Sequence, residues 1–381
     1  MTTSRSRKTA RSARWWPSRP WEGRTLEGSG PALPPRPTSV VTNVGSAPAA
    51  GTTFLLVFDD IHLGSISAST ARTTFERFLR ESADDGDRVL IVSTGTGAAW
   101  SGTLPADRGD LLAFVATLQA RLMEHGPMTE HDALRIAAYS DDVVLQRVIG
   151  RYLNQGVCAA PPFACDKFVK ADAAANDARW RRLRQASLEV MQRAVESLGG
   201  LRGRKSVTLM TEGFIHDQDD DAYRGLVGAA QRVNAAIYFV DVRGLQALTE
   251  SASAAAARDV GLNSPAAGSA TAPGPIAGAS QMMFQSSMER SQRFTTIGVE
   301  TMADDTGGFV VQGTNDLAGG LSRAASESRR YYLLGFVPTA AKAPGVFRKI
   351  KVRVAREGLT VRARKGYYAP RPGGAPPGRG A

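Results

Sequence analysis

The sequence predicts an α/β fold built on a doubly wound, mainly parallel sheet. Short apolar runs at 54–60, 88–93, 205–211 and 236–241 have the composition of strands that are buried on both faces. Segments with apolar residues at helical spacing separate these runs. This alternation of strand and helix is typical of parallel sheets that carry helices on both faces.

The first elements follow one another in regular order. The strand at 54–60 precedes a helix at 70–82, and a turn rich in Asp leads to the strand at 88–93. A helix starts at Asp110, which suits an N-cap. Another helix follows Thr129, whose hydroxyl also suits an N-cap and whose acidic successors suit the helix dipole.

The later elements repeat the alternation and then change character. A helical stretch leads into a long helix at about 171–198. The domain then continues with strands at 205–211, 236–241, 309–311 and 331–336 and with helices at 223–234, 295–304 and 316–329. Residues 347–354 and 360–365 largely alternate apolar and charged side chains, which predicts a C-terminal antiparallel β extension.

Composition divides the chain into four parts. We expect a disordered, basic, Pro-rich leader at 1–50, an α/β domain at 51–338, the β extension at 339–370 and a disordered tail at 371–381. Within the domain we expect a helical insertion at about 130–180 and a mobile loop at about 251–290, which is rich in Ala, Ser, Gly and Pro.

The net charge of +11 is concentrated at the two ends of the chain. Residues 1–37 hold eight Lys and Arg against two Glu, residues 342–381 hold eleven against one, and the stretch between them is net acidic. This distribution is typical of solvated tails and a basic strand, so we expect no nucleic-acid binding.

No apolar run is long enough to span a bilayer, so no transmembrane segment is expected. The basic N-terminus is not followed by the apolar segment of a secretory signal. The sequence therefore indicates either that the protein stays inside the cell or that its true start is missing.

Two cysteines, Cys158 and Cys165, flank a Pro-containing loop. No second Cys or His pair accompanies them, so a zinc site is not expected. A local disulfide, which requires an oxidising compartment, is the favoured interpretation, and two free thiols in a loop are the alternative.

Two adjacent carboxylates, Asp59 and Asp60, end the first strand at the edge where parallel sheets bind ligands. A Walker B element would need a P-loop, but the nearest match, at 199–206, has Arg204 in place of the second Gly and precedes a strand. An aspartyl phosphatase would need Asp-x-Asp, whereas adjacent side chains on a strand point to opposite faces. Both enzyme classes are therefore disfavoured.

A third interpretation is a divalent-cation site assembled from several loops at this edge. Hard cations such as Mg²⁺ prefer oxygen ligands. The candidate ligands, chosen by resemblance to cation sites of the von Willebrand factor A type, are Asp59 and Asp60 after the first strand, Thr129 at the start of a helix, and Glu212 after the strand at 205–211. His62 and His216 also follow strands and could meet at this edge, or they could be loop histidines in water.

Several segments together resemble the bacterial VWFA-related domain proteins (von Willebrand factor type A-like). These segments are 37–43, 53–63, 203–206 with 211–214, 241–245, 305–308 with 315–317, and 331–336 through 364–368. They extend over residues 37–370, and the C-terminal segments are the most specific. The resemblance implies a von Willebrand A-type, Rossmann-like domain, and an extracytoplasmic location because members usually carry a signal peptide.

The resemblance also implies a metal-ion-dependent adhesion site, here in degenerate form. The pattern expects Asp-x-Ser-x-Ser after the first strand, but residues 59–63 lack both serines, and Ser65 and Ser67 lie downstream. Glu212 stands where Asp is expected. We therefore expect either a weak site for Mg²⁺ or another divalent cation, or carboxylates that cap the following helix and pair with an Arg.

Our leading hypothesis is a non-enzymatic, adhesion-type module in or beyond the bacterial envelope, which binds a protein partner at the C-terminal edge of the sheet. The competing hypothesis is a metal-dependent hydrolase that uses Asp59, Asp60 and His62.

Overall fold

The structure, a computed structural model, describes residues 51–121, 128–154, 156–158, 162–215, 220–244, 295–332, 346–354, 358 and 361–368. The expected leader, the loop at 251–290, most of the strand at 331–336, the C-terminal tail and His216 lie outside these residues. Residues 48–331 and 340–381 form one compact unit. A second unit comprises residues 1–47 and 332–339, of which only Tyr332 is described.

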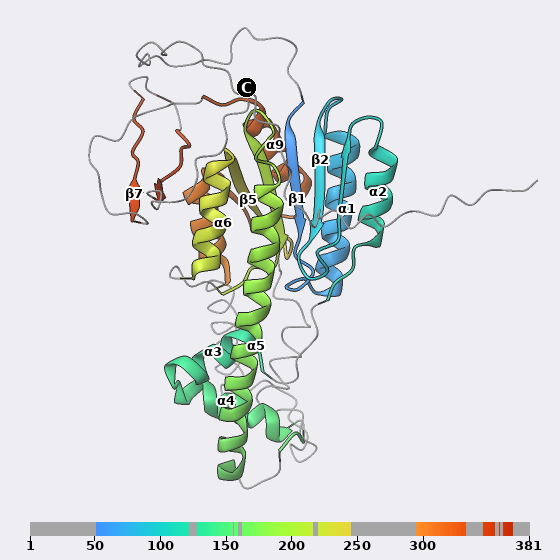
Figure 1. The fold of residues 1–381 in the computed structure, drawn as a ribbon. Helices are drawn as coiled ribbons and strands as arrows, with labels where there is room; N and C mark the ends of the chain where they lie inside the picture. The colour runs from blue at the N-terminus through green and yellow to red at the C-terminus, as the bar shows by residue number, and fades with distance from the viewer. Residues whose placement is uncertain are drawn as a thin grey trace, which may run out of the picture. The chain divides into compact units, whose positions relative to one another are not determined.

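A six-stranded sheet forms the centre of the first unit (Figure 1). Its order is β3-β2-β1-β4-β5-β6, and every pair is parallel except β2 with β3. The strands are β1 (Thr53–Phe58), β2 (Arg88–Ser93), β3 (Ala99–Thr103), β4 (Lys205–Thr211), β5 (Ala235–Asp241) and β6 (Val310–Val311). The chain leaves β1 toward β2 on one side and later returns to β4 on the other. The carboxyl ends of β1 and β4 therefore flank the topological switch point, where open α/β sheets bind ligands.

Helices cover both faces of the sheet, which confirms the doubly wound, mainly parallel arrangement. The helices are α1 (Ser65–Glu81), α2 (Arg108–Thr117), α3 (Glu130–Tyr139), α4 (Asp142–Asn154), α5 (Pro162–Glu196), α6 (Asp221–Arg232), one at 295–306, and α9 (Leu317–Arg329). α1, α2 and α9 pack on the face that carries Phe54, Leu56 and Phe58. α5, α6 and the helix at 295–306 pack on the face that carries Leu55 and Val57.

A helical lobe consists of α3, α4 and the N-terminal part of α5. It has its own apolar core, in which Val148 and Tyr152 of α4 pack with Val169 of α5. The long helix α5 contributes to this core and, further along, to the core under the sheet (Figure 1). The lobe therefore connects directly to the helix that lies against β1.

The structure differs from the sequence prediction in two places, one at the edge of the sheet and one in the C-terminal extension. β3 was not predicted, because Trp100 is its one large apolar side chain and an antiparallel edge strand needs no continuous apolar run. The C-terminal extension does form an antiparallel pair, β7 (Phe347–Lys349) with β8 (Gly366–Tyr368). However, β7 is shorter than expected and β8 begins after, not within, the alternating run at 360–365.

Among the described residues, no helix combines the length and apolar character needed to cross a membrane.

Candidate functional site

The candidate site lies where β1, β2 and β4 end side by side. Asp59 and Asp60 follow β1, Thr94 and Gly95 follow β2, and Glu212 follows β4. The register pairs Phe58 with Ser93 on one side and with Met210 on the other, so the residues after each strand meet at one edge.

Asp59 is fully buried, and both of its carboxylate oxygens are engaged. Oδ2 lies 2.8 Å from Nδ1 of His62. Oδ1 accepts hydrogen bonds from Thr94 Oγ1 at 2.7 Å and from Ser187 Oγ of α5 at 3.3 Å. The His62 backbone N–H donates to the Asp59 carbonyl at 3.0 Å, and this tight turn brings the imidazole back onto the carboxylate.

Asp60 is also buried, and its carboxylate accepts a hydrogen bond from Thr94, the same threonine that donates to Asp59. Its Oδ1 accepts the Gly95 backbone N–H at 2.5 Å and Thr94 Oγ1 at 3.1 Å. A Cβ on Gly95 would lie 2.9 Å from Asp60 Oδ2, so a larger residue there would have to displace the carboxylate. The expectation of opposite faces was wrong, because β1 ends at Phe58 and the chain turns before the second carboxylate.

The His62 ring packs against two aromatic side chains and is only 4% exposed. It stacks on Trp180 of α5, with ring centroids 5.9 Å apart, and contacts Phe214, with centroids 5.6 Å apart. Its Nε2 is buried and has no hydrogen-bond partner among the described residues. We call Asp59, Asp60, His62, Thr94 and Ser187 the edge cluster.

The two charged partners stabilise each other's ionised forms. Burial alone would raise the pKa of the Asp59 carboxyl, but the charge of His62 and hydrogen bonds from His62, Thr94 and Thr211 outweigh it and lower that pKa. Burial would likewise lower the pKa of His62, but the Asp59 carboxylate outweighs it and raises that pKa. The geometry therefore favours a buried carboxylate–imidazolium pair.

The helical lobe contributes a second carboxylate to the surroundings of His62. Burial raises the pKa of Glu130 at the start of α3, although the charges of His62 and Arg184 act to lower it. Arg184 of α5 donates to Glu130 Oε1 at 3.2 Å. The charged side chains of Asp59 after β1, Glu130 of α3 and Arg184 of α5 therefore all act on the imidazole of His62.

Thr129 has a different role from the expected cation ligand. Its Oγ1 accepts the Asp132 backbone N–H at 3.1 Å and donates to Asp132 Oδ2 at 2.8 Å, so it is the N-cap of α3 in a capping box. The predicted N-cap is confirmed. The neighbouring Glu130, which sequence reasoning missed, is the residue that interacts with His62.

Glu212 is engaged at the start of α1 and not with the edge cluster. Its Oε1 accepts the backbone N–H of Gly64 at 2.9 Å, at the N-terminus of α1, where a carboxylate interacts favourably with the helix dipole. Gly213 follows with a φ of 91°, and a Cβ there would lie 2.7 Å from the Thr295 carbonyl oxygen. The loop after β4 therefore contacts both the N-terminus of α1 and Thr295 of the helix at 295–306.

The residues present do not fit a divalent cation. Such an ion needs several oxygen ligands directed at one point, whereas both Asp59 oxygens are engaged by protein groups, and Thr129 and Glu212 are bonded elsewhere. Within the described part of the chain, no three His, Cys, Asp or Glu side chains are grouped to hold a metal ion.

Sequence reasoning found the two carboxylates but not their hydroxyl partners. Ser65 and Ser67 lie in the first turn of α1, and the serine that reaches Asp59 is Ser187, which lies 128 residues along the chain. No local sequence pattern marks Ser187 or Thr94. Only the packing of α5 and β2 against β1 brings their hydroxyls to the carboxylates.

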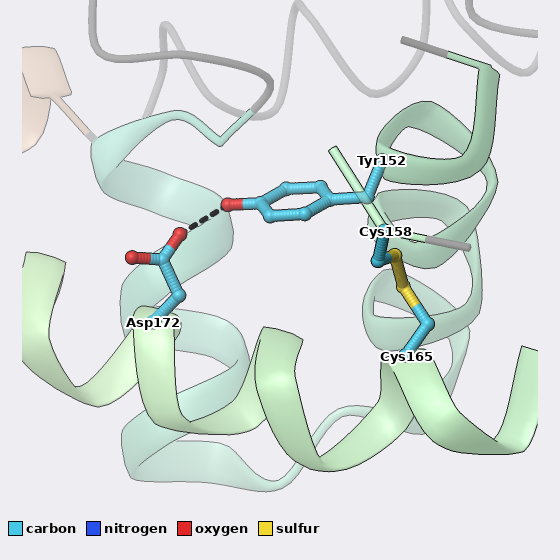
Figure 2. The surroundings of a disulfide bond; sticks show 4 residues. All are labelled: Tyr152, Cys158, Cys165 and Asp172. Carbon is cyan, nitrogen blue, oxygen red and sulfur yellow. Dashed lines mark hydrogen bonds between the residues drawn. A yellow bond between two sulfur atoms is a disulfide. The ribbon is translucent and has the colours of Figure 1, made fainter. Parts of the chain in front are cut away.

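The predicted disulfide is present in the helical lobe. Cys158, just after α4, is bonded to Cys165 near the start of α5, with Cα atoms 5.8 Å apart (Figure 2). Figure 2 also shows the Tyr152 hydroxyl donating to the Asp172 carboxylate, which joins the same two helices a short distance away. The bridge and this hydrogen bond therefore link α4 and the residues after it to the N-terminal part of α5.

Comparison of the chain with protein-family models, with curated proteins and with solved structures gave no match.

Proposed function

We propose that this chain is a non-enzymatic protein-binding module of the von Willebrand A type, which contacts its partner with the C-terminal edge of its sheet. The proposal needs no bound cation. Its support is the combination of a closed edge cluster with exposed apolar side chains on the same edge.

The closed state of the edge cluster argues against chemistry at this position. Asp59, Asp60 and His62 are 0%, 1% and 4% exposed, and their hydrogen bonds are mainly to one another and to neighbouring backbone and hydroxyl groups. A general base or nucleophile has to come within hydrogen-bond reach of its substrate. Groups that are buried and hydrogen-bonded in this way are better suited to stabilising the edge of the sheet than to catalysing a reaction.

The surface above the edge cluster carries the observation on which the proposal depends. Ile66, in the first turn of α1, is 86% exposed, and Ile297, in the helix at 295–306, is 53% exposed. The loop after β4 is bonded to both segments: Glu212 accepts the Gly64 N–H just before α1, and the Phe214 N–H donates to the Thr295 carbonyl. The two exposed isoleucines therefore lie on elements that are both bonded to the loop after β4, and exposed apolar side chains in such a position suit contact with a protein partner.

The location outside the cytoplasm is part of the same proposal. Its supports are the bond between Cys158 and Cys165, which is typical of proteins in oxidising compartments, and the family resemblance.

Site-specific photocrosslinking tests the binding edge. A benzoylphenylalanine would replace Ile66 or Ile297 in the producing cells, and Val143 of α4, which is 71% exposed, is the matched control position. The proposal expects one protein adduct of the same size from both edge positions and none from the control. Ile66→Asp should abolish the adduct formed at Ile297. Equal adducts at all three positions, or none at the edge, would refute the proposal.

One observation favours the competing hydrolase. The Asp59 carboxylate orients the imidazole of His62 as the acid of a catalytic triad orients its base. A screen of phosphate and carboxylic esters would decide between the two functions. Turnover that is lost in His62→Gln while the protein stays folded would replace the binding proposal with the enzymatic one.

A further inference from the structure

We propose that the C-terminal extension docks the protein on a membrane surface that is rich in anionic lipids. The contact is made by Lys349, Lys351 and Arg353, which we call the cation row. The row shares no residue with the edge cluster or with the two exposed isoleucines, so its test requires no protein partner.

The charge of the extension is the first argument. Residues 346–368 hold eight Lys and Arg and one acidic residue, Glu357. Four of these cations interact with other groups of the protein, and they are Arg348, Arg362, Arg364 and Lys365. Lys349, Lys351 and Arg353 have no acidic partner among the residues that the structure describes. The cation row is therefore left for a partner outside the chain.

The arrangement of the row is the second argument. Exposure alternates along residues 349–353, with the three cations exposed and Ile350 and Val352 half-buried. Alternate residues of an extended segment share one face, and they follow one another at about 7 Å. The three charges therefore stand in line on one exposed face, as contact with an extended anionic surface requires.

The attachment of the extension is the third argument. Gln231 of α6 donates its side-chain amide to the Gly366 carbonyl at 3.1 Å, and Arg364 donates to the Gln231 carbonyl at 3.1 Å. The Ile350 N–H donates to the Lys365 carbonyl at 2.7 Å, next to the pairing of β7 with β8. The segment with the cation row is therefore bonded through its partner strand to the main domain, and it differs in this from a solvated tail.

Exposed apolar side chains favour lipid over a soluble polyanion. Val346 and Val354 lie at the two ends of the segment that carries the row, and Val361 lies in the returning segment; all three are exposed. Lys and Arg are attracted to anionic headgroups, and apolar side chains beside them can enter the interface between headgroups and acyl chains. A soluble polyanion would pair with the cations but would offer the valines no apolar region.

Flotation of the full chain with lipid vesicles tests the inference. The protein should float with vesicles of equimolar phosphatidylcholine and phosphatidylglycerol, but not with vesicles of phosphatidylcholine alone, and salt should weaken the binding. The triple variant Lys349→Gln, Lys351→Gln and Arg353→Gln should bind about 100-fold less well, because each Lys or Arg near an anionic surface contributes about 5-fold. Lys351→Gln alone should lose about 5-fold, and it serves if the triple variant folds poorly.

The matched control removes the same charge from scattered exposed positions. Arg80→Gln, Arg182→Gln and Arg202→Gln, on α1, α5 and the segment before β4, should together leave the binding nearly unchanged. Every variant keeps the basic residues 1–37, so their charge cannot produce the difference.

Three outcomes would overturn the inference. The first is that the folded variants of the cation row bind anionic vesicles as the wild type does. The second is that Val346→Ser with Val354→Ser leaves vesicle binding unchanged, since the valines should enter the interface. The third is that poly-glutamate or duplex DNA binds more tightly than the vesicles and depends on the same three cations, which would assign the row to a soluble polyanion.

Discussion

Replacing Asp59 by Ala should be among the most destabilising single changes at the edge of the sheet. The substitution leaves the imidazole of His62 buried without its counter-charge and removes the acceptor of two buried hydroxyls, those of Thr94 and Ser187. Removing one partner of a buried ion pair costs about 3–5 kcal/mol. For a unit of this size, that loss lowers the melting temperature by roughly 10 °C.

Asp85→Ala is the matched control for this prediction. Asp85 makes an ion pair with Arg108 at 3.7 Å, but its side chain is 77% exposed, so its loss should cost less than about 1 kcal/mol. Equilibrium unfolding in urea, followed by tryptophan fluorescence and circular dichroism, measures both free energies of unfolding. If Asp59→Ala unfolds cooperatively with a loss no larger than that of Asp85→Ala, the buried pair does not hold the edge as described.

Three further predictions follow from the same contacts. Replacing Cys158 and Cys165 by Ser should lower the free energy of unfolding by about 2.4 kcal/mol, the loop-closure value for a separation of 7 residues, and two free thiols in protein from an oxidising compartment would refute the bridge. The raised pKa of His62 and the lowered pKa of Asp59 imply that the pair stabilises the fold between those two values. Stability should therefore fall as pH rises above the ordinary His pKa of about 6.5 and through the raised folded-state pKa of His62, and urea midpoints for His62→Gln should lack this fall. Thr129→Ala should cost about 1 kcal/mol through loss of the α3 cap, and a loss several times larger in the same urea assay would indicate a role beyond capping.

The central strands of the sheet could be predicted because strands that are buried on both faces are rich in apolar residues. β1, β4 and β5 are buried along their whole length. β1 and β5 are almost continuous apolar runs, as strands buried on both faces usually are, whereas β4 has polar residues between its apolar ones. β3 could not be predicted in the same way, because one of its edges is unpaired and its residues are mostly half-buried. Local composition therefore identifies central strands better than edge strands.

The C-terminal extension shows how tertiary contacts override a local pattern. Residues 360–365 alternate as a strand does, but Arg364 donates to the Gln231 carbonyl and to Asn234 Oδ1. Burial, with the nearby charge of Arg204, lowers the pKa of Arg364 to about 10, so this side chain is removed from solvent where it meets Gln231 and Asn234. The strand pairing with β7 consequently begins two residues later, at Gly366.

The sequence predicts where the candidate site lies, but not which residues of other elements contribute to it. Asp59 and Asp60 are next to each other in the sequence and end a strand, so their place at the edge followed from the fold alone. Ser187 and Glu130 come from α5 and α3, and no periodicity or spacing connects them to β1. The difference between an open cation site and a closed ion pair depends on these distant residues.

Calorimetric titration of the wild-type protein with Mg²⁺, Mn²⁺ and Ca²⁺ tests the central claim most directly. Because both carboxylate oxygens of Asp59 are engaged by protein groups, no saturable heat of binding is expected for any of the three ions. A saturable heat that disappears in folded Asp59→Asn would contradict the account and show that the edge of the sheet is a metal site.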